Sequence, residues 1–284
     1  MALKLMYITN DVEIAKIAQK NHVDRIFIDM EYIGKDDRQK GMDTVKSHHT
    51  IEDIVAIRQI LNESELLVRI NPIHSRNEIY KGSEYEINKV IESGADIVML
   101  PMYKTVDEVK QFCDIVNRRA KTMLLVETLE ACEILEEVLE LGVIDEFHIG
   151  LNDLHLAMKK NFMFELLADG TVDKICDKFK KYNVPFGFGG IARLGYGELP
   201  AECIIAEHYR IGSTKAILSR SFCNVEKINN PKEIEKLFNN EIIKIRNYEE
   251  KCKSMSQVDF ERNRNVVIDK VKEIVKKRKA KDGR

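Results

Sequence analysis

Eight short apolar runs, separated by longer amphipathic stretches, limit the possible folds of this chain more than any other feature. The runs are rich in Val, Ile, Leu, Phe and Met, and they span residues 4–9, 25–31, 65–71, 96–102, 122–127, 146–153, 185–192 and 214–221. Most are continuously apolar rather than alternating, which is typical of parallel strands covered on both faces. We therefore predict eight parallel strands.

Helical spacing marks the segments between most of these runs. The clearest examples are residues 12–19, 50–61, 84–94, 105–116 and 129–142. Gly94 and Gly142 stand where helix C-caps belong. Thr50, with Asp53 three residues later, resembles a capping box. These signals predict that strands and helices alternate along most of the chain.

This alternation predicts an α/β fold, a (β/α)8 TIM barrel with additional C-terminal helices. A doubly wound open sheet is the alternative, but it usually carries a Gly-rich turn after its first strand, where this chain has Thr9-Asn10-Asp11. With no linker or low-complexity segment, we expect one domain over residues 1–284, with 231–284 as a helical extension. An apolar stripe within 258–278 packs either on the chain's own barrel or on a neighbouring subunit.

Composition excludes several classes of protein. The chain has 284 residues with 45 basic and 47 acidic side chains, a formal net charge of −2. This balance argues against general binding to nucleic acid or to membranes. No run is long and apolar enough to span a bilayer, and the N-terminus lacks the layout of a signal peptide. Six scattered cysteines without a C-x-x-C pair predict reduced thiols in a cytoplasmic protein.

Polar residues follow several of the predicted strands, at the end of a barrel where chemistry takes place. Glu127 and Asp153 end the neighbouring fifth and sixth runs. Two carboxylates with open positions for water and substrate oxygens are the usual way to hold Mg²⁺ or Mn²⁺. No histidine-rich group accompanies them, which disfavours zinc. Helix capping and salt bridging are the alternative roles for both acids.

Arginines at the same end are candidates for binding an anionic substrate. Arg69 ends the third run and can grip a carboxylate or a developing enolate with two parallel hydrogen bonds. Its alternative is a structural ion pair with Asp29 or Glu31, which end the second run and are themselves candidate substrate contacts. Arg193, in the turn GGIARLG, is a candidate for a substrate phosphate or carboxylate.

Two histidines, His48 and His49, precede the helix predicted at 50–61. The loop before that helix lies on the catalytic face of a barrel, so each is a candidate general base or substrate contact. A solvated loop histidine is the alternative. No lysine stands at a strand end in a position suited to a Schiff base, which disfavours imine-forming aldol chemistry.

Five segments in order, RIFIDME, LLVRIN, GADIVMLPM, LLVETLEA and FHIGLNDL, resemble the HpcH/HpaI aldolase and citrate lyase β-subunit superfamily. The resemblance implies a (β/α)8 barrel with Mg²⁺ or a similar ion on Glu127 and Asp153, and with Arg69 on the keto acid. It also implies C-terminal helices that pack or swap between subunits, and hence a homo-oligomer.

The implied activity is that of a divalent-metal-dependent carbon–carbon lyase that forms or uses the enolate of pyruvate or a related 2-keto acid, with an aldehyde or acyl partner. One residue departs from the pattern: Tyr32 stands where the aldolases have His and the lyases an acid. His48 or His49 would then replace the missing base. Two alternatives remain, a metal-dependent barrel acting on an acyl thioester or a phosphoenolpyruvate-type substrate, and a non-catalytic ligand-binding barrel.

Overall fold

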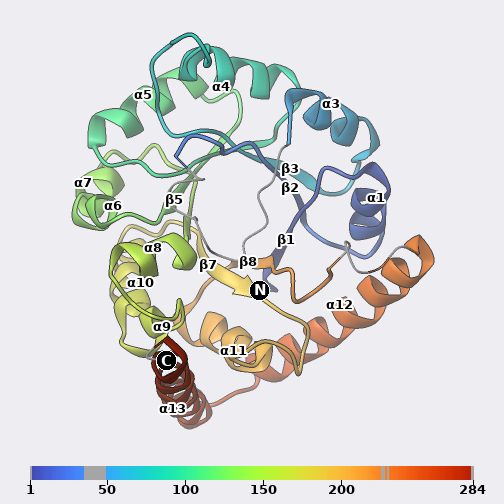
Figure 1. Cartoon of the computed structure of the whole chain (residues 1–284), viewed down its shortest axis with the longest axis vertical. Coiled ribbons are helices and arrows are strands. Elements are labelled where there is room, and N and C mark those ends of the chain that lie inside the picture. The colour runs from blue at the N-terminus through green and yellow to red at the C-terminus, as the bar shows by residue number, and fades with distance from the viewer. Residues whose placement is uncertain (1, 35–48, 225–227, 229, 283–284) are drawn as a thin grey trace. The chain divides into compact units, whose positions relative to one another are not determined.

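The computed structural model describes residues 2–34, 49–224, 228 and 230–282. Within these residues, eight parallel strands follow one another around a closed barrel in the order β1 to β8 (Figure 1). They are β1 (Lys4–Ile8), β2 (Arg25–Asp29), β3 (Glu65–Arg69), β4 (Ile97–Leu100), β5 (Lys121–Val126), β6 (Glu146–Ile149), β7 (Phe186–Ile191) and β8 (Lys215–Leu218). The predicted fold class, with helices between the strands and further helices at the C-terminal end, is confirmed.

The sixth predicted strand was too long. β6 ends at Ile149, and helix α8 (Leu151–Ala157) begins two residues later. Leu151 and Leu154, three residues apart, are both buried, which is the spacing of a helix rather than of a strand. Asn152 and Asp153 therefore lie in the first turn of α8 rather than at a strand tip, and the residue at the N-cap is Gly150.

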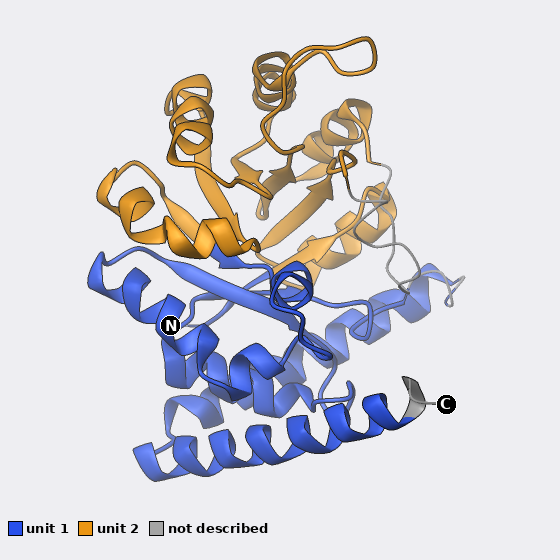
Figure 2. Ribbon diagram, turned by 60° about the vertical axis from the view of Figure 1, so that its left-hand side comes forward, with its two compact units in different colours: residues 1–5, 148–284 blue, residues 6–147 orange. Residues whose placement is uncertain are grey.

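The chain divides into two compact units (Figure 2). Unit 1 comprises residues 1–5 and 148–284, and unit 2 comprises residues 6–147. The prediction of one domain over residues 1–284 stays a prediction.

Unit 2 contains most of the helices that the sequence predicted. They are α1 (Val12–Lys20), α3 (Ile51–Ile60), α4 (Ser83–Glu92), α5 (Val106–Val116), α6 (Leu129–Glu133) and α7 (Leu135–Glu140). The capping box of Thr50 and Asp53 is present. Gly94 and Gly142 follow helix ends with positive φ, as C-cap glycines do. The helix predicted at 129–142 is instead divided into α6 and α7 at Ile134.

The strands of unit 2 pair without a register shift from β2 to β5, and Asp29 lies directly opposite Arg69. At their amino ends, Arg25 is fully buried and donates two hydrogen bonds to Glu146, at 2.6 and 2.8 Å. A third goes to Glu65 at 2.8 Å. A buried guanidinium needs such partners, so this cluster joins the first residues of β2, β3 and β6.

Unit 1 contains β7, β8 and the remaining described helices. They are α8, α9 (Glu165–Ala168), α10 (Thr171–Lys181), α11 (Ala201–Ile211), α12 (Pro231–Lys253) and α13 (Gln257–Asp282). β7 passes very close to β8: a Cβ added at Gly187 would lie 2.3 Å from Cγ and 2.5 Å from the carbonyl oxygen of Lys215. Gly187 is thus the residue that lets these two strands approach.

The apolar stripe of α13 packs on its own chain, the first of the two predicted alternatives. Val267 and Val271 are 1% and 3% exposed, and α13 lies against α11 and α9. Asn263 adds hydrogen bonds to the carbonyl oxygen of Cys203 and to Glu207. The homo-oligomer predicted through the C-terminal helices stays a prediction.

Candidate active site

Arg69 occupies the carboxyl end of β3 in a fixed geometry. Its Nε and Nη2 donate hydrogen bonds to the two carboxylate oxygens of Asp29, each at 2.8 Å. Its Nη1 lies 3.1 Å from Oε2 of Glu31. The structural ion pair that the sequence left as an alternative is thus present, with both acids. A guanidinium has more N–H donors than these three contacts use, so the pairing leaves Arg69 able to bind an oxyanion as well.

Carboxylates dominate the surroundings of Arg69. Burial lowers the pKa of its guanidinium, but Asp29 and Glu31 raise that pKa by more, and Glu127 raises it further. Asp29, Glu31 and Glu127 are all buried. Three carboxylates and one guanidinium carry a formal charge of −2 when all are ionised. Buried charge needs compensation, and a divalent cation would balance these four side chains.

Glu127 follows the last residue of β5 and is tied to the loop after β4. Its Oε1 accepts a hydrogen bond from the backbone N–H of Met102 at 3.1 Å. The next residue, Thr128, caps α6 by accepting from the N–H of Ala131, and its hydroxyl donates to the carbonyl oxygen of Tyr103. The Glu127 carboxylate is therefore held between two strand ends. Carboxylate oxygen is the ligand type that Mg²⁺ and Mn²⁺ prefer.

His49 contacts the backbone of Asp29 in the same cluster. It is buried, and its Nδ1 accepts a hydrogen bond from the backbone N–H of Asp29 at 3.0 Å. This contact assigns the ring proton of a neutral His49 to Nε2. His49 thus supports Asp29 directly, rather than lying in solvent as the alternative had it. His48 lies outside the described residues, so its predicted role stays a prediction.

Tyr32, which stands in the place of the expected base, is a donor at neutral pH. Burial raises the pKa of its phenol to about 12, and the carboxylates of Asp29, Asp53 and Glu86 contribute to the rise. Its backbone N–H donates to Oδ1 of Asn71 at 2.8 Å. A phenol with this pKa keeps its proton, so Tyr32 can give a proton or a hydrogen bond but is a poor base.

Asn71 and Glu86 join this site, although the sequence gave neither a role. Asn71 lies two residues beyond β3, and Glu86 lies in the first turn of α4. Oε1 of Glu86 accepts from both the backbone N–H and the side-chain amide of Asn71, at 3.1 and 2.8 Å. The position of Asn71 after a strand was visible in the sequence. Its contact with a helix further along the chain was not.

Two predicted site residues belong to unit 1. Asp153 is half-buried in the first turn of α8. Arg193 follows β7, and its guanidinium stacks 4.0 Å from the ring centroid of Tyr196. Arg69, Asp29, Glu31, Glu127 and His49 all belong to unit 2. The pairing of Glu127 with Asp153 as metal ligands, and the role of Arg193 in binding a substrate phosphate or carboxylate, therefore stay predictions from the sequence.

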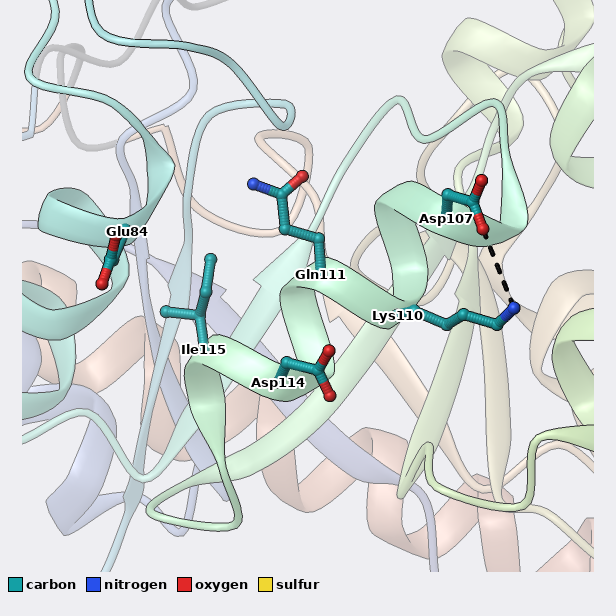
Figure 3. Close-up of a pocket in the computed structure, with 6 residues that line it drawn as sticks. All are labelled: Glu84, Asp107, Lys110, Gln111, Asp114 and Ile115. Atoms are coloured by element: carbon teal, nitrogen blue, oxygen red, sulfur yellow. Dashed lines mark ion pairs between the residues drawn. The ribbon is translucent and has the colours of Figure 1, made fainter.

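An open hollow on the surface of unit 2 contains none of the predicted site residues. It is lined by side chains of α4 and α5, namely Glu84, Asp107, Lys110, Gln111, Asp114 and Ile115 (Figure 3). Lys110 and Asp107, three residues apart on α5, form an ion pair at 3.7 Å. This hollow lies between outer helices, whereas barrel enzymes have their active sites at the carboxyl ends of the strands.

Across the part of the chain that the structure describes, no group of three or more His, Cys, Asp or Glu side chains is arranged to hold a metal ion. None of the described helices is long and apolar enough to cross a membrane.

The fold and this cluster define a class of protein. It is a (β/α)8 barrel with a buried arginine–carboxylate site at the carboxyl ends of its strands, where barrel enzymes carry their active sites. The model of the HpcH/HpaI aldolase/citrate lyase family matches residues 5–163, more than half of the chain, so the chain belongs to this family. It is therefore a lyase-type barrel, and members of the family generally depend on a divalent metal ion.

Solved structures share the fold. An HpcH/HpaI aldolase from Desulfitobacterium hafniense is 12% identical with a TM-score of 0.59, over 83% of this chain and 93% of its own. An HpcH/HpaI aldolase/citrate lyase family protein from Burkholderia cenocepacia is 13% identical, with a TM-score of 0.57 over 82% and 95%. A citrate synthase variant is 13% identical, with a TM-score of 0.53 over 76% and 85%. No protein with a curated description matches the sequence significantly.

Proposed function

We propose that the protein is a divalent-metal-dependent carbon–carbon lyase that forms or uses the enolate of pyruvate or a related 2-keto acid. The observation that carries the proposal is the placement of Arg69. It is held at the end of β3 by Asp29 and Glu31, in the field of the buried Glu127. An oriented cation beside a carboxylate of the type that binds Mg²⁺ is what stabilising an enolate requires.

Arg69 would bind the keto acid through the N–H donors that Asp29 and Glu31 leave available. Asp29 holds the guanidinium by two parallel hydrogen bonds, so its remaining donors have a fixed direction. A group oriented in advance loses little on reorganisation when negative charge develops on the substrate oxygen. In this role Asp29 and Glu31 set the position of Arg69, and Arg69 contacts the substrate.

Glu127 would hold the metal ion, Mg²⁺ or Mn²⁺. The residues present fit such an ion, because the donor is a carboxylate and the excess of buried negative charge around Arg69 favours a cation. Asp153 is the second ligand that we propose, on the sequence alone. When bound, the metal supplies a Lewis acid that polarises the oxygens of the keto acid.

The partner substrate is an aldehyde or an acyl group, and Arg193 would bind an anionic group on it. The stacking of Arg193 on Tyr196 holds its guanidinium in one place, which supports this role. An acyl partner is the second candidate, since one of the structures of the same fold is a citrate synthase variant. We also propose a homo-oligomer formed through the C-terminal helices.

Metal-dependent decarboxylation of oxaloacetate tests the proposal, because it reports enolate formation without knowledge of the second substrate. The variant is Glu127→Gln, with Glu133→Gln as its control, since Glu133 is exposed on the following helix. We expect Glu127→Gln to lower kcat/KM on the order of 10²- to 10³-fold, the usual effect of removing one preorganised group that stabilises charge. A Glu127→Gln variant as active as the Glu133→Gln control would overturn the assignment.

A further inference from the structure

The segment after β2, residues 30–33, is fixed to the end of β3 by its backbone. Met30 donates its N–H to the carbonyl oxygen of Arg69 at 2.9 Å, which continues the sheet. Tyr32 and Ile33 then donate their N–H groups to one atom, Oδ1 of Asn71, at 2.8 and 2.9 Å. Beyond the end of the sheet, a single side-chain oxygen therefore accepts the next two backbone hydrogen bonds of this segment.

Glu86 sets the orientation of that asparagine. Its Oε1 accepts from the side-chain amide and the backbone N–H of Asn71 at once. With the amide nitrogen bound to Glu86, Oδ1 of Asn71 is turned toward the two N–H groups of the segment. The two N–H donors on one side and the Glu86 acceptor on the other leave one assignment of the Asn71 amide, because the opposite assignment would face donor with donor and acceptor with acceptor.

This chain of contacts reaches the Arg69 cluster. The segment carries Glu31, whose Oε2 lies 3.1 Å from Nη1 of Arg69. It also carries Tyr32, whose phenol lies within the field of Asp29 and Glu86. A rotation of the Asn71 amide would release both N–H groups, and the side chains of Glu31 and Tyr32 would move with the backbone.

The carboxylate of Glu86 costs free energy at this buried position. Its other oxygen, Oε2, is buried and has no hydrogen-bond partner among the residues that the structure describes. Burial raises the pKa of the Glu86 carboxyl, while the two hydrogen bonds from Asn71 oppose that rise. A buried acceptor without a partner costs free energy, so the gain from Glu86 lies in how it orients Asn71 rather than in net stability.

We propose that Glu86 is a positioning residue for the enolate chemistry: through Asn71 it holds residues 31–33, and so keeps Glu31 and Tyr32 in place at the Arg69 cluster. The inference rests on the proposed function. Among the residues that the structure describes, both hydrogen bonds to the Glu86 carboxylate come from Asn71 and none joins it to Arg69 or Asp29, so its positioning of the segment is exerted through Asn71. The competing explanation is that the contacts of Glu86 with Asn71 fix this loop and stabilise the fold without affecting catalysis.

Four variants separate these explanations. Glu86→Ala removes the acceptor, whereas Glu86→Gln keeps an oxygen for Asn71. Asn71→Asp keeps the oxygen for the two N–H groups but sets one carboxylate against another. Combining Asn71→Asp with Glu86→Gln lets the glutamine amide donate to the new carboxylate, which restores the side-chain hydrogen bond with its direction reversed. The backbone N–H of residue 71 shared the same Glu86 oxygen and is not restored by this exchange. Glu84→Ala is the control, because Glu84 lies on the same helix but faces the surface hollow (Figure 3).

Steady-state oxaloacetate decarboxylation is the first readout. We expect Glu86→Ala and Asn71→Asp each to lower kcat on the order of tenfold or more, because a small misplacement of site groups is expensive in rate. KM should change much less. Glu86→Gln should stay close to wild type, and the double variant should recover part of the activity that Asn71→Asp loses. Glu84→Ala should match wild type.

Hydrogen–deuterium exchange of the peptide that contains residues 30–33 is the second readout, and it does not depend on activity. Exchange should be faster in Glu86→Ala than in wild type and unchanged in Glu84→Ala. Unchanged exchange and kcat in Glu86→Ala, or a double variant no better than Asn71→Asp, would overturn the proposal. If wild type lacks decarboxylase activity, the proposed function fails, and exchange alone decides whether Glu86 holds the segment. If Glu86→Ala does not fold, Glu86→Gln and the Asn71→Asp pair decide.

Discussion

A lysine cannot replace Arg69, because two nitrogens of the guanidinium donate parallel hydrogen bonds to the two carboxylate oxygens of Asp29. In Arg69→Lys a single ammonium keeps at most one of these bonds. We expect the free energy of unfolding to fall by about 1.5–3 kcal/mol, the usual contribution of a charge-assisted hydrogen bond. Decarboxylase activity should fall as well, since the remaining cation has no fixed direction. Urea unfolding and kcat/KM measure the two effects, and a variant with wild-type values of both would contradict this role.

His208 gives unit 1 a pH dependence whose direction can be worked out. It is fully buried, stacks 3.8 Å from Phe188, and contacts the hydroxyl of Ser213 at 2.8 Å. Burial, with a contribution from His148, lowers its pKa to about 3. The unfolded chain takes up a proton on this histidine below about pH 6.5, whereas the folded chain does not until about pH 3. Stability is therefore lost as the pH falls through this range.

The matching experiment replaces His208 with glutamine, which keeps a polar partner for Ser213 but does not titrate. Loss of the stacked ring should lower the Tm at pH 7.5. Protonation of His208 in the unfolded chain lowers the stability of wild type at low pH, and the glutamine variant has no such group. The difference in Tm between wild type and His208→Gln should therefore shrink at pH 5. A difference that stays constant or grows on acidification would show that His208 is not the neutral buried group described here.

Single residues also show where sequence reasoning succeeds and fails. Arg69 and Glu127 were identified because each follows an apolar run, and position after a strand is a local property. Glu86 was missed because its partner, Asn71, lies in the loop after β3, and only a tertiary hydrogen bond joins that loop to α4. The closeness of Gly187 to Lys215 is likewise set by the approach of two strands rather than by local sequence.

At the scale of elements, α13 stabilises unit 1 through the buried part of its stripe. Val271→Ala removes two methyl groups from a site that is 3% exposed. At about 0.8 kcal/mol for each buried methyl group, the free energy of unfolding should fall by about 1.5 kcal/mol or more. The control is Val258→Ala on the same helix, since Val258 is 61% exposed and should change stability by no more than about 0.5 kcal/mol. Equal effects in urea unfolding would mean that α13 does not pack as described.

Element boundaries were harder to predict than element types. The sixth strand was extended to Asp153 because the apolar run continues through Leu151. Yet Leu151 belongs to the buried face of α8, and a short apolar run does not distinguish the end of a strand from the start of a helix. The consequence is chemical as well as structural, since Asp153 lies on a helix and not on a strand tip. The division of residues 129–142 at Ile134 left no signal in the sequence that we recognised.

For the whole molecule, the order of its elements determined the fold class. Eight runs separated by helical stretches were enough to predict the barrel, because parallel strands need crossover connections and helices supply them. Five of the described residues predicted for the site, among them Arg69 and Glu127, lie in unit 2. Asp153, the second proposed metal ligand, and Arg193 belong to unit 1. The roles of both are predicted from the sequence alone. Membership of the family identifies the protein as a lyase-type barrel. The loops at the carboxyl ends of the strands determine the partner substrate in barrel enzymes.

For the whole molecule, we propose that this protein stabilises the enolate of a 2-keto acid with a divalent metal ion. The most direct measurement is exchange of the C3 protons of pyruvate for deuterium, followed by NMR with the wild-type protein in the presence of Mg²⁺ or Mn²⁺ and again after EDTA. We predict exchange that requires the protein and the metal, that stops on chelation and that returns when the metal is restored. Absence of exchange with either metal, in a folded protein shown to bind the ion, would contradict the account.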